Sequence, residues 1–234
     1  LISKAFQVGF ERSQYIIHPD TGNYHQSATL IMEGAVAKRF KALASYGDIY
    51  DEQANKSFQQ SVSELPYDLT DKQTQAVVNA LAFKIACITG GAGTGKTTVL
   101  RTVLRAMHFS GYQIHAIALS GRAAMRMHES IGFLTSTIAA VLSKEEINDD
   151  GKHVVVIDEA SMIDIATMYR IVTHIHPNVR LLFVGDPDQL PPISAGKVLD
   201  DIVKSGTIMN TMLDIVKRQE GSTGIPEYSA QVRD

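Results

Sequence analysis

The feature that most constrains this sequence is a glycine-rich turn between an apolar run and a helical pattern. The run Ile85–Thr89 has the composition of a buried strand, and a helical repeat of apolar residues begins at Lys96. Between them, Gly90, Gly95, Lys96 and Thr97 have the spacing of a P-loop. Glycines let backbone N–H groups converge on phosphate oxygens, and the helix N-terminus adds a favourable dipole. The sequence therefore predicts a nucleoside triphosphate site rather than an ordinary glycine-rich turn.

The P-loop also predicts roles for individual side chains. Lys96 supplies a positive charge to the β- and γ-phosphates, and the Thr97 hydroxyl can ligate Mg²⁺. The residues expected to surround the phosphates are Gly90, Gly91, Ala92, Gly93, Thr94, Gly95, Lys96, Thr97 and Thr98.

Beyond the P-loop, apolar runs alternate with helical patterns. Strands are expected at Ile114–Leu119, His153–Asp158 and Arg180–Asp186, and the region after Thr207 gives no clear pattern. This alternation predicts an α/β fold with a doubly wound parallel sheet, which binds ligands at the carboxyl ends of its strands. We assign residues 66–234 to this P-loop domain.

The first part of the chain, residues 1–65, is expected to be a small, mainly helical appendage. Residues 6–10 alternate as in a short strand, and residues 15–17 resemble a second strand. An amphipathic helix is expected over 27–46. The polar stretch 51–64 is either a solvated helix or a linker.

Composition limits the class of protein. The chain is 44% hydrophobic, which excludes wholesale disorder, and its net charge of −3 means that any nucleic-acid binding must use local basic patches. No apolar run is long enough to span a membrane, so we expect no membrane partner. The single cysteine, Cys87, lies in the apolar strand before the P-loop and can form no internal disulfide. This favours a reducing, cytoplasmic location.

Two acidic residues directly follow the strand that ends at Ile157. Asp158 can hold Mg²⁺ through water, and Glu159 can accept a proton from the water that attacks the γ-phosphate. The alternative is an acidic pair that only stabilises the start of the next helix. With a P-loop upstream, we favour the catalytic interpretation.

Two glutamines are also candidates. Gln189 follows the strand at 180–186 and is placed to sense the γ-phosphate, unless its segment is only an Asp-Pro turn. Gln73 is the fourth residue of a capping box that begins at Thr70. From the residues alone, Gln73 either contacts the nucleotide or only closes its own helix.

Two arginines have similarly open interpretations. Arg218 is either an arginine finger on the γ-phosphate or a solvated cation at a helix end. Arg122 lies at a helix start, where its charge opposes the helix dipole, so a DNA phosphate would explain its position.

Taken together and in order, these motifs resemble the first motor domain of a superfamily-one DNA helicase of the RecD/TraA type. The resemblance covers roughly residues 66–220, and weakly the helix at 27–46. After the P-loop, the resemblance rests on four segments: Ser120–Ala124, Val155–Met162, Val184–Pro192 and Lys217–Gln219. The combination of Val155–Met162 with Val184–Pro192 is the part most specific to this family.

The resemblance implies an ATP-driven helicase with Mg²⁺ as the metal. It makes Gln73 the residue that reads adenine and Gln189 the residue that couples nucleotide state to DNA. Arg218 becomes the γ-phosphate arginine, and Lys96, Asp158 and Glu159 keep the roles given above. The residues implied to contact the backbone of single-stranded DNA are Ser120, Gly121, Arg122 and Thr137.

The sequence departs from the family pattern at several positions. Ala92 replaces a frequent proline, which is harmless because only backbone is used there. Ser120 replaces a threonine but keeps the hydroxyl, Ala139 stands where a histidine is often found, and Lys217 replaces an aromatic residue. The position of Ala139 weakens the expected DNA contact at Thr137.

The second RecA-like domain of such helicases is not found among these residues. We therefore expect the 234-residue chain to be a fragment that binds ATP weakly and hydrolyses it poorly. The resemblance implies 5′–3′ movement on single-stranded DNA by the intact protein. Recombination, repair or conjugation subunits are its expected partners.

Two other function classes remain open. One is a vestigial motor domain that serves as a DNA- or protein-binding module, which the acidic net charge favours. The other is a P-loop enzyme of a different class, such as a small-molecule kinase. The order of the motifs argues against the second alternative.

Overall fold

The computed structural model describes residues 2–17, 20–148 and 150–214, and the statements below concern these residues. Its centre is a parallel sheet of six strands in the order β5-β4-β6-β7-β3-β8. The strands are β3 (Ile85–Gly90), β4 (Gln113–Ala118), β5 (Thr135–Thr137), β6 (His153–Ile157), β7 (Arg180–Gly185) and β8 (Met209–Leu213). This is the doubly wound arrangement that the alternating pattern predicts.

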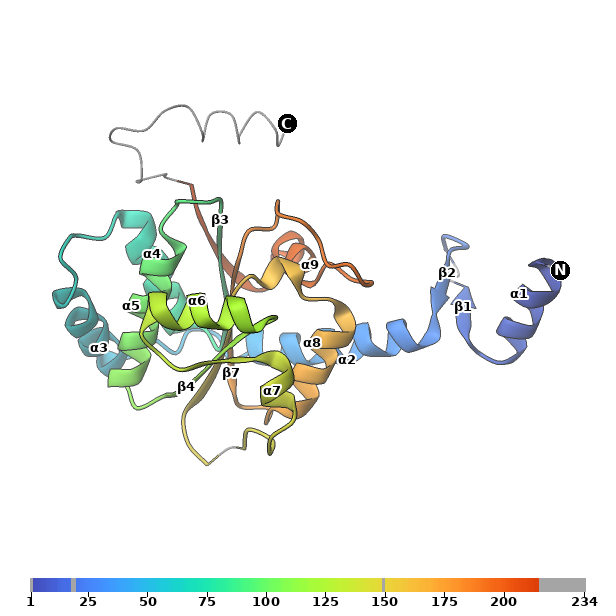
Figure 1. Cartoon of the computed structure of the whole chain (residues 1–234), viewed down its shortest axis with the longest axis horizontal. Coiled ribbons are helices and arrows are strands. Elements are labelled where there is room, and N and C mark those ends of the chain that lie inside the picture. The colour runs from blue at the N-terminus through green and yellow to red at the C-terminus, as the bar shows by residue number, and fades with distance from the viewer. Residues whose placement is uncertain (1, 18–19, 149, 215–234) are drawn as a thin grey trace.

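Helices cover both faces of the sheet (Figure 1). The helices that share an apolar cluster with one face are α2 (Ser27–Ala44), α7 (Ile138–Leu142), α8 (Ile165–His174) and α9 (Val198–Ser205). Those that cover the other face are α4 (Asp71–Ala82), α5 (Lys96–Phe109) and α6 (Gly121–Ile131), with α3 (Glu52–Ser63) packed on the outside of α5. The expected core therefore forms as two apolar layers.

Strand β3 shows why both layers form. Its Ile85 and Cys87 belong to one apolar cluster, whereas Ala86 and Ile88 belong to the other. Successive side chains of a strand point to opposite faces, so a strand buried on both sides has a continuous apolar sequence. Cys87 is fully buried in this central strand, and burial raises the pKa of its thiol.

The end of α4 is held by a buried cation at the start of β7. The guanidinium of Arg180, which is only 5% exposed, donates to the carbonyl oxygens of Ala80, Leu81 and Phe83 at 2.8, 2.9 and 2.7 Å. It also donates to the Tyr112 hydroxyl at 3.0 Å. The last carbonyls of a helix lack intrahelical partners and attract positive charge. Arg180 therefore joins the helix before the P-loop to the sheet.

Two histidines lie near the amino ends of β4 and β6. Nε2 of His115 is 3.0 Å from Nδ1 of His153, and the two rings stack with centroids 5.3 Å apart. Burial lowers the pKa of His115, and the neighbouring His153 lowers it further. This end of the sheet is opposite to the carboxyl ends where ligands are expected.

The first residues differ from the prediction. Residues 6–10 are part of a helix, α1 (Ile2–Glu11), and not of a strand. Apolar residues at 6, 8 and 10 fit a strand, but positions 6 and 10 are also four apart, which places them on one face of a helix. The expected strand at 15–17 is confirmed as β1 (Tyr15–Ile17), which pairs with β2 (Tyr24–Gln26). Figure 1 shows α1, β1 and β2 at the far end of α2, away from the sheet.

Helices before residue 66 take part in the core. Val36, Phe40 and Leu43 of α2 are buried in the cluster on one face, and Phe58 of α3 belongs to the cluster on the other. The polar stretch 51–64 is thus a helix rather than a linker, with its Asp51 side chain capping the N-terminus. The domain boundary between residues 65 and 66 stays a prediction.

Candidate functional site

The P-loop connects β3 directly to α5, as the motif requires. Gly95 precedes the helix in the left-handed region at φ 89°, and a Cβ built there would lie 2.4 Å from Nε2 of Gln73. Only glycine tolerates both conditions. The buried Thr94 hydroxyl donates to the Gly91 carbonyl at 2.9 Å and braces the loop, whereas Ala92 is exposed.

Lys96 folds back over the loop that precedes it. Its Nζ donates to the carbonyl oxygens of Gly90 and Gly91, at 2.7 and 2.8 Å. The ammonium group is therefore already held above the turn where phosphate oxygens would bind. The apolar face of α5 behind it is fully buried, as the helical pattern predicts, through Val99, Leu100, Val103, Leu104 and Met107.

A cavity of about 520 Å³ lies beside the loop. It is lined by Tyr67, Gln73, Gly93, Gly95, Lys96, Thr97 and Thr98. The Tyr67 ring is half exposed, and its hydroxyl is 3.3 Å from the Thr98 hydroxyl. The cavity thus combines P-loop backbone with an aromatic ring and a side-chain amide.

Gln73 lies in this cavity and also completes the capping box. Its Oε1 accepts from the Thr70 N–H at 3.1 Å, and its own N–H donates to the Thr70 hydroxyl at 3.2 Å. These two bonds fix the orientation of the amide, so Nε2 is directed at Gly95. The capping role is confirmed, and a contact with adenine stays a prediction.

A second, smaller cavity of about 180 Å³ collects the candidate catalytic residues. Lys96 and Thr97 from the P-loop, Asp158 and Glu159 from the end of β6, and Gln189 from the loop after β7 all line it. These residues are far apart in the sequence and meet because β3, β6 and β7 are neighbouring parallel strands. These five sequence-predicted residues are thus brought to one place.

The turn after β6 is tightly constrained. The Glu159 N–H donates to Oδ1 of Asp158 at 2.8 Å, and Glu159 itself has φ 52°, a left-handed conformation that is uncommon outside glycine. Burial raises the pKa of the Asp158 carboxyl, and the hydrogen bond from the Glu159 N–H opposes this shift. The charge of Glu159 also raises the pKa, whereas the charges of Lys96 and Arg126 lower it. Gly185 leaves room for this turn, because a Cβ there would lie 3.2 Å from the Ala160 nitrogen.

The segment after the acidic pair contains two separate helical elements. A short 3-10 turn, η1 (Ala160–Met162), follows Glu159, and α8 begins only after Asp164, whose side chain caps it. The acidic pair therefore does not lie at the start of a long helix. Residues 160–164 separate the pair from the first turn of α8. The catalytic roles of Asp158 and Glu159 stay a prediction.

The loop after β7 carries Gln189 on an aspartate turn. Asp186 is 1% exposed, and its Oδ1 accepts from the Asp188 N–H at 3.2 Å, while its carbonyl accepts from the Gln189 N–H at 3.1 Å. The turn is real, but it directs Gln189 to the cavity rather than away from it. The Asp-Pro turn is therefore present, and the role of Gln189 in sensing the γ-phosphate stays a prediction.

The candidate DNA contacts lie at the carboxyl ends of two adjacent strands. Ser120 follows β4 and caps α6 by accepting from the Ala123 N–H at 3.2 Å, and Gly121 and Arg122 are exposed beside it. Thr137 ends β5 and caps α7 in the same way at 3.1 Å. Each hydroxyl still has its hydrogen to donate to a phosphate oxygen. Ser120, Arg122 and Thr137 thus lie on the same edge of the sheet as the cavity lined by Asp158 and Glu159.

Arg218 lies outside the described residues. Within the described ranges, no group of three or more His, Cys, Asp or Glu side chains could by itself hold a metal ion. Thr97 and Asp158 nevertheless offer oxygen atoms to one cavity, and Mg²⁺ is commonly bound by one or two protein ligands together with phosphates and water. The residues present therefore fit a nucleotide-bound magnesium ion. In the part of the chain that the structure describes, no helix has the length and apolarity to cross a bilayer.

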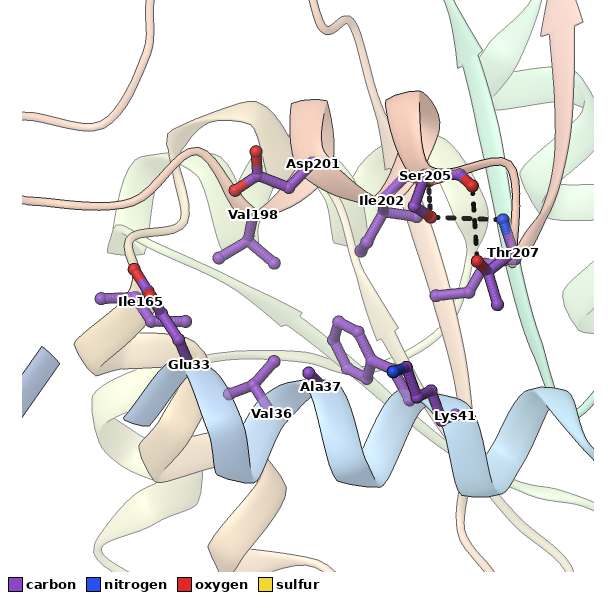
Figure 2. A pocket seen from close by; sticks show the side chains of 12 residues that line it. Glu33, Val36, Ala37, Lys41, Ile165, Val198, Asp201, Ile202, Ser205 and Thr207 are labelled. Carbon is purple, nitrogen blue, oxygen red and sulfur yellow. Dashed lines mark hydrogen bonds between the residues drawn. The ribbon is translucent and has the colours of Figure 1, made fainter. Parts of the chain in front are cut away.

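A third cavity, of about 330 Å³, lies between α2, α8 and α9 (Figure 2). Its walls are mostly apolar, with Glu33, Lys41 and Asp201 among the lining residues. Figure 2 shows Ser205 and Thr207 hydrogen-bonded to each other rather than presented to a ligand. This cavity contains no P-loop residue and none of the acids or glutamines that follow β6 and β7, so it is separate from the candidate site.

Two residues near the nucleotide cavities were missed by sequence reasoning. Tyr67 follows a proline in a segment without regular pattern, so no local signal shows that its ring faces the P-loop. Arg126 lies on α6, and its Nη2 is 3.6 Å from Oε1 of Glu159. Its spacing of four from Arg122 is the one signal that could have suggested a shared role.

Comparison with known proteins agrees with this geometry. Residues 68–234 match the AAA_30 family, described as an AAA domain. The chain is 31% identical over 201 residues to the RecBCD enzyme subunit RecD of Haemophilus influenzae, covering 71% of this chain and 30% of that protein. It is 31% identical over 135 residues to the ATP-dependent RecD2 DNA helicase of Deinococcus radiodurans, covering 55% and 19% respectively.

A conjugal transfer protein TraA of Rhizobium radiobacter is 34% identical over 133 residues, which cover 55% of this chain and 12% of that protein. The chain thus spans less than a third of the length of each of these relatives. Among solved structures, a Pif1 helicase from Candida albicans superposes with a TM-score of 0.53 at 22% identity, covering 72% of this chain and 44% of that one. This structural likeness confirms the RecA-like P-loop fold.

Proposed function

Because this chain belongs to the AAA domain family, as a superfamily-one helicase motor domain of the RecD/TraA type, we propose that it binds ATP with Mg²⁺ and couples hydrolysis to movement on single-stranded DNA. One observation carries the proposal. Lys96, Thr97, the Asp158–Glu159 pair and Gln189 come from three strand ends and line one cavity.

In the proposed mechanism, Lys96 exchanges its bonds to the loop carbonyls for oxygens of the β- and γ-phosphates. The backbone N–H groups of the P-loop and the start of α5 would bind the same phosphates. Thr97 and Asp158 would hold Mg²⁺, which neutralises charge on the phosphate oxygens when it is bound. The raised pKa of Asp158 fits a carboxylate that is stabilised once a cation lies beside it.

Glu159 is the proposed general base for the attacking water, and Gln189 the residue that senses the γ-phosphate. Arg218 keeps its proposed role on the γ-phosphate. At the other end of the nucleotide, Gln73 would hydrogen-bond the adenine edge. The half-exposed ring of Tyr67 lines the same cavity and offers the base a face on which to stack.

Single-stranded DNA is proposed to run over the carboxyl edge of β4 and β5. Ser120, Gly121, Arg122 and Thr137 would contact its phosphates. Movement in the 5′–3′ direction and a role in recombination, repair or conjugation are further parts of the proposal. Partner subunits are proposed because one relative is named as a subunit of the RecBCD enzyme and another as a conjugal transfer protein. A cytoplasmic location, where ATP and DNA would both be available, is part of the same proposal.

The test compares ATP hydrolysis with and without single-stranded DNA, using the native protein that contains these residues. We expect strong stimulation by DNA, and its loss in Glu159→Gln but not in the matched control Glu129→Gln, an exposed acid on α6. ATP binding by the 234-residue chain, lost in Lys96→Ala, is the second readout. DNA binding without any stimulated hydrolysis would refute the motor and favour a binding module.

A further inference from the structure

The carboxylate proposed as general base has a cationic partner outside the nucleotide site. Arg126 Nη2 lies 3.6 Å from Oε1 of Glu159, and the two side chains are 65% and 39% exposed. Glu129 lies only three residues from Arg126 on the same helix, yet among the ion pairs of the described residues Arg126 pairs with Glu159. The contact therefore links two separate elements, α6 and the turn after β6.

Hydrogen bonds hold the backbone of Glu159 in place, so only its side chain can move from one contact to another. Its N–H donates to Asp158 at 2.8 Å, and its carbonyl accepts from the Met162 N–H at 3.0 Å. Its φ of 52° is uncommon for a residue with a side chain. Glu159 lines the cavity that it shares with Lys96 while it is paired with Arg126, so a rotation about its side-chain bonds is enough to exchange the arginine for the cavity.

Arg126 also lies where DNA is proposed to bind. Arg122 precedes it by four residues, which puts both guanidinium groups on one face of α6. Two cations at this spacing repel each other unless an anion lies between them. A DNA phosphate held at the start of α6 would supply that anion and compete with Glu159 for Arg126.

We propose that Arg126 is a positioning residue shared between two anions, the Glu159 carboxylate when no DNA is bound and a phosphate of single-stranded DNA when it is. Binding of DNA then releases Glu159 toward the attacking water, so one side chain links the DNA track to hydrolysis. This inference rests on the proposed function and deepens it.

Because such linkage is reciprocal, it is testable without turnover. Removing the Glu159 charge frees Arg126 for phosphate, so Glu159→Gln tightens the binding of a labelled oligothymidylate, measured by fluorescence anisotropy without nucleotide. An exposed ion pair of this kind predicts a change in Kd of about two- to fivefold. In an Arg126→Gln background, the same Glu159→Gln change no longer gives this effect.

The controls separate the inference from general electrostatics and from the proposed function. Glu129→Gln removes one negative charge from the same helix and shows how much any lost carboxylate tightens DNA binding. The shared role of Arg126 is overturned if Glu159→Gln tightens DNA binding equally with and without Arg126. It is also overturned if Glu159→Gln tightens DNA binding no more than Glu129→Gln does. Failure of the unchanged protein to bind the oligonucleotide refutes the proposed DNA track instead.

A kinetic readout distinguishes positioning from a merely structural role. In the native protein that contains these residues, Arg126→Gln raises hydrolysis without DNA and lowers the fold stimulation by DNA, whereas Arg126→Lys keeps part of the stimulation. If Arg126→Gln lowers the hydrolysis rates with and without DNA by the same factor, so that the fold stimulation is unchanged, the inference is contradicted.

Discussion

The two roles of Gln73 can be separated by a matched pair of variants. Thr70→Ala removes the hydroxyl that accepts from the Gln73 N–H at 3.2 Å, and loss of such a cap costs about 1 kcal/mol. Gln73→Ala removes the return bond, from the Thr70 N–H to Oε1 at 3.1 Å, which is worth a similar amount of about 1 kcal/mol. Both variants should therefore lose nearly the same free energy of unfolding in urea melts.

Their effects on nucleotide binding should differ. A domain with about 5 kcal/mol or more of stability stays above about 99% folded after losing 1 kcal/mol, so neither variant weakens ATP binding by unfolding. Gln73→Ala also loses its hydrogen bonds to the base, which predicts a rise in the Kd for ATP of about five- to tenfold. Thr70→Ala leaves the backbone N–H that orients the amide, and its Kd should change less than about twofold.

Calorimetric titration with ATP measures the difference, and tripolyphosphate, which has no base, is the control ligand. It should bind both variants with the same affinity, because the phosphate end of the cavity is unchanged. Equal Kd values for ATP in Thr70→Ala and Gln73→Ala would refute the base contact. Gln73 would then only close its helix.

Further predictions concern the rest of the chain. Tyr67→Ala should raise the Kd for ATP about three- to tenfold because it removes the stacking surface, whereas Tyr67→Phe should bind ATP almost normally. Similar ATP affinities for the two variants in the same titration would argue against stacking. Arg180→Met should cost about 3 kcal/mol of unfolding free energy, measured in urea, because two carbonyls of α4 and that of its C-cap residue lose their donor. Tyr112→Phe should cost about 1 kcal/mol. Because the folded state lowers the pKa of His115, the unfolded chain binds the proton first, so stability should fall as pH drops below about 6.5; His115→Gln should flatten this slope, and an unchanged slope would count against it.

The fold class and the phosphate end of the site could be predicted from the sequence because their signals are local. The strand, turn and helix of the P-loop are consecutive, and Lys96 and Thr97 are placed by that turn alone. Asp158 and Gln189 follow apolar runs, and parallel strands bring their carboxyl ends to one edge. Local pattern and tertiary arrangement agree at these positions.

The elements that were missed depend on partners elsewhere in the chain. Strand β8 contains Asn210 and Thr211, which interrupt its apolar pattern. In the structure Asn210 accepts from the Thr89 hydroxyl at 3.0 Å, and Thr211 accepts from Asn79 at 2.9 Å. These hydrogen bonds allow polar groups inside the sheet, and no window of sequence around residue 210 shows their donors. Strand β5 and helix α7 are too short for a periodic signal.

Candidate site residues outside the motifs were missed for the same reason. Tyr67 reaches the nucleotide cavity only because the segment before α4 lies beside the P-loop. The partner of Glu159 comes from α6, and a surface arginine on a helix normally indicates nothing more than a solvated face. Prediction from the sequence therefore finds site residues whose positions are set by their own local segment. It misses residues that reach the site only through tertiary packing.

The burial of Cys87 has a practical consequence for experiments in solution. A thiol-reactive dye attacks the thiolate, and this thiol is both enclosed and held in its protonated form. Labelling of the unmodified chain can then proceed only when the central strand opens. The labelling rate therefore reports the rate of global unfolding. Exposed cysteines introduced on α6 or beside Tyr67 would react while Cys87 stays unlabelled. Fluorophores for distance measurements can therefore be attached to this chain without first replacing Cys87.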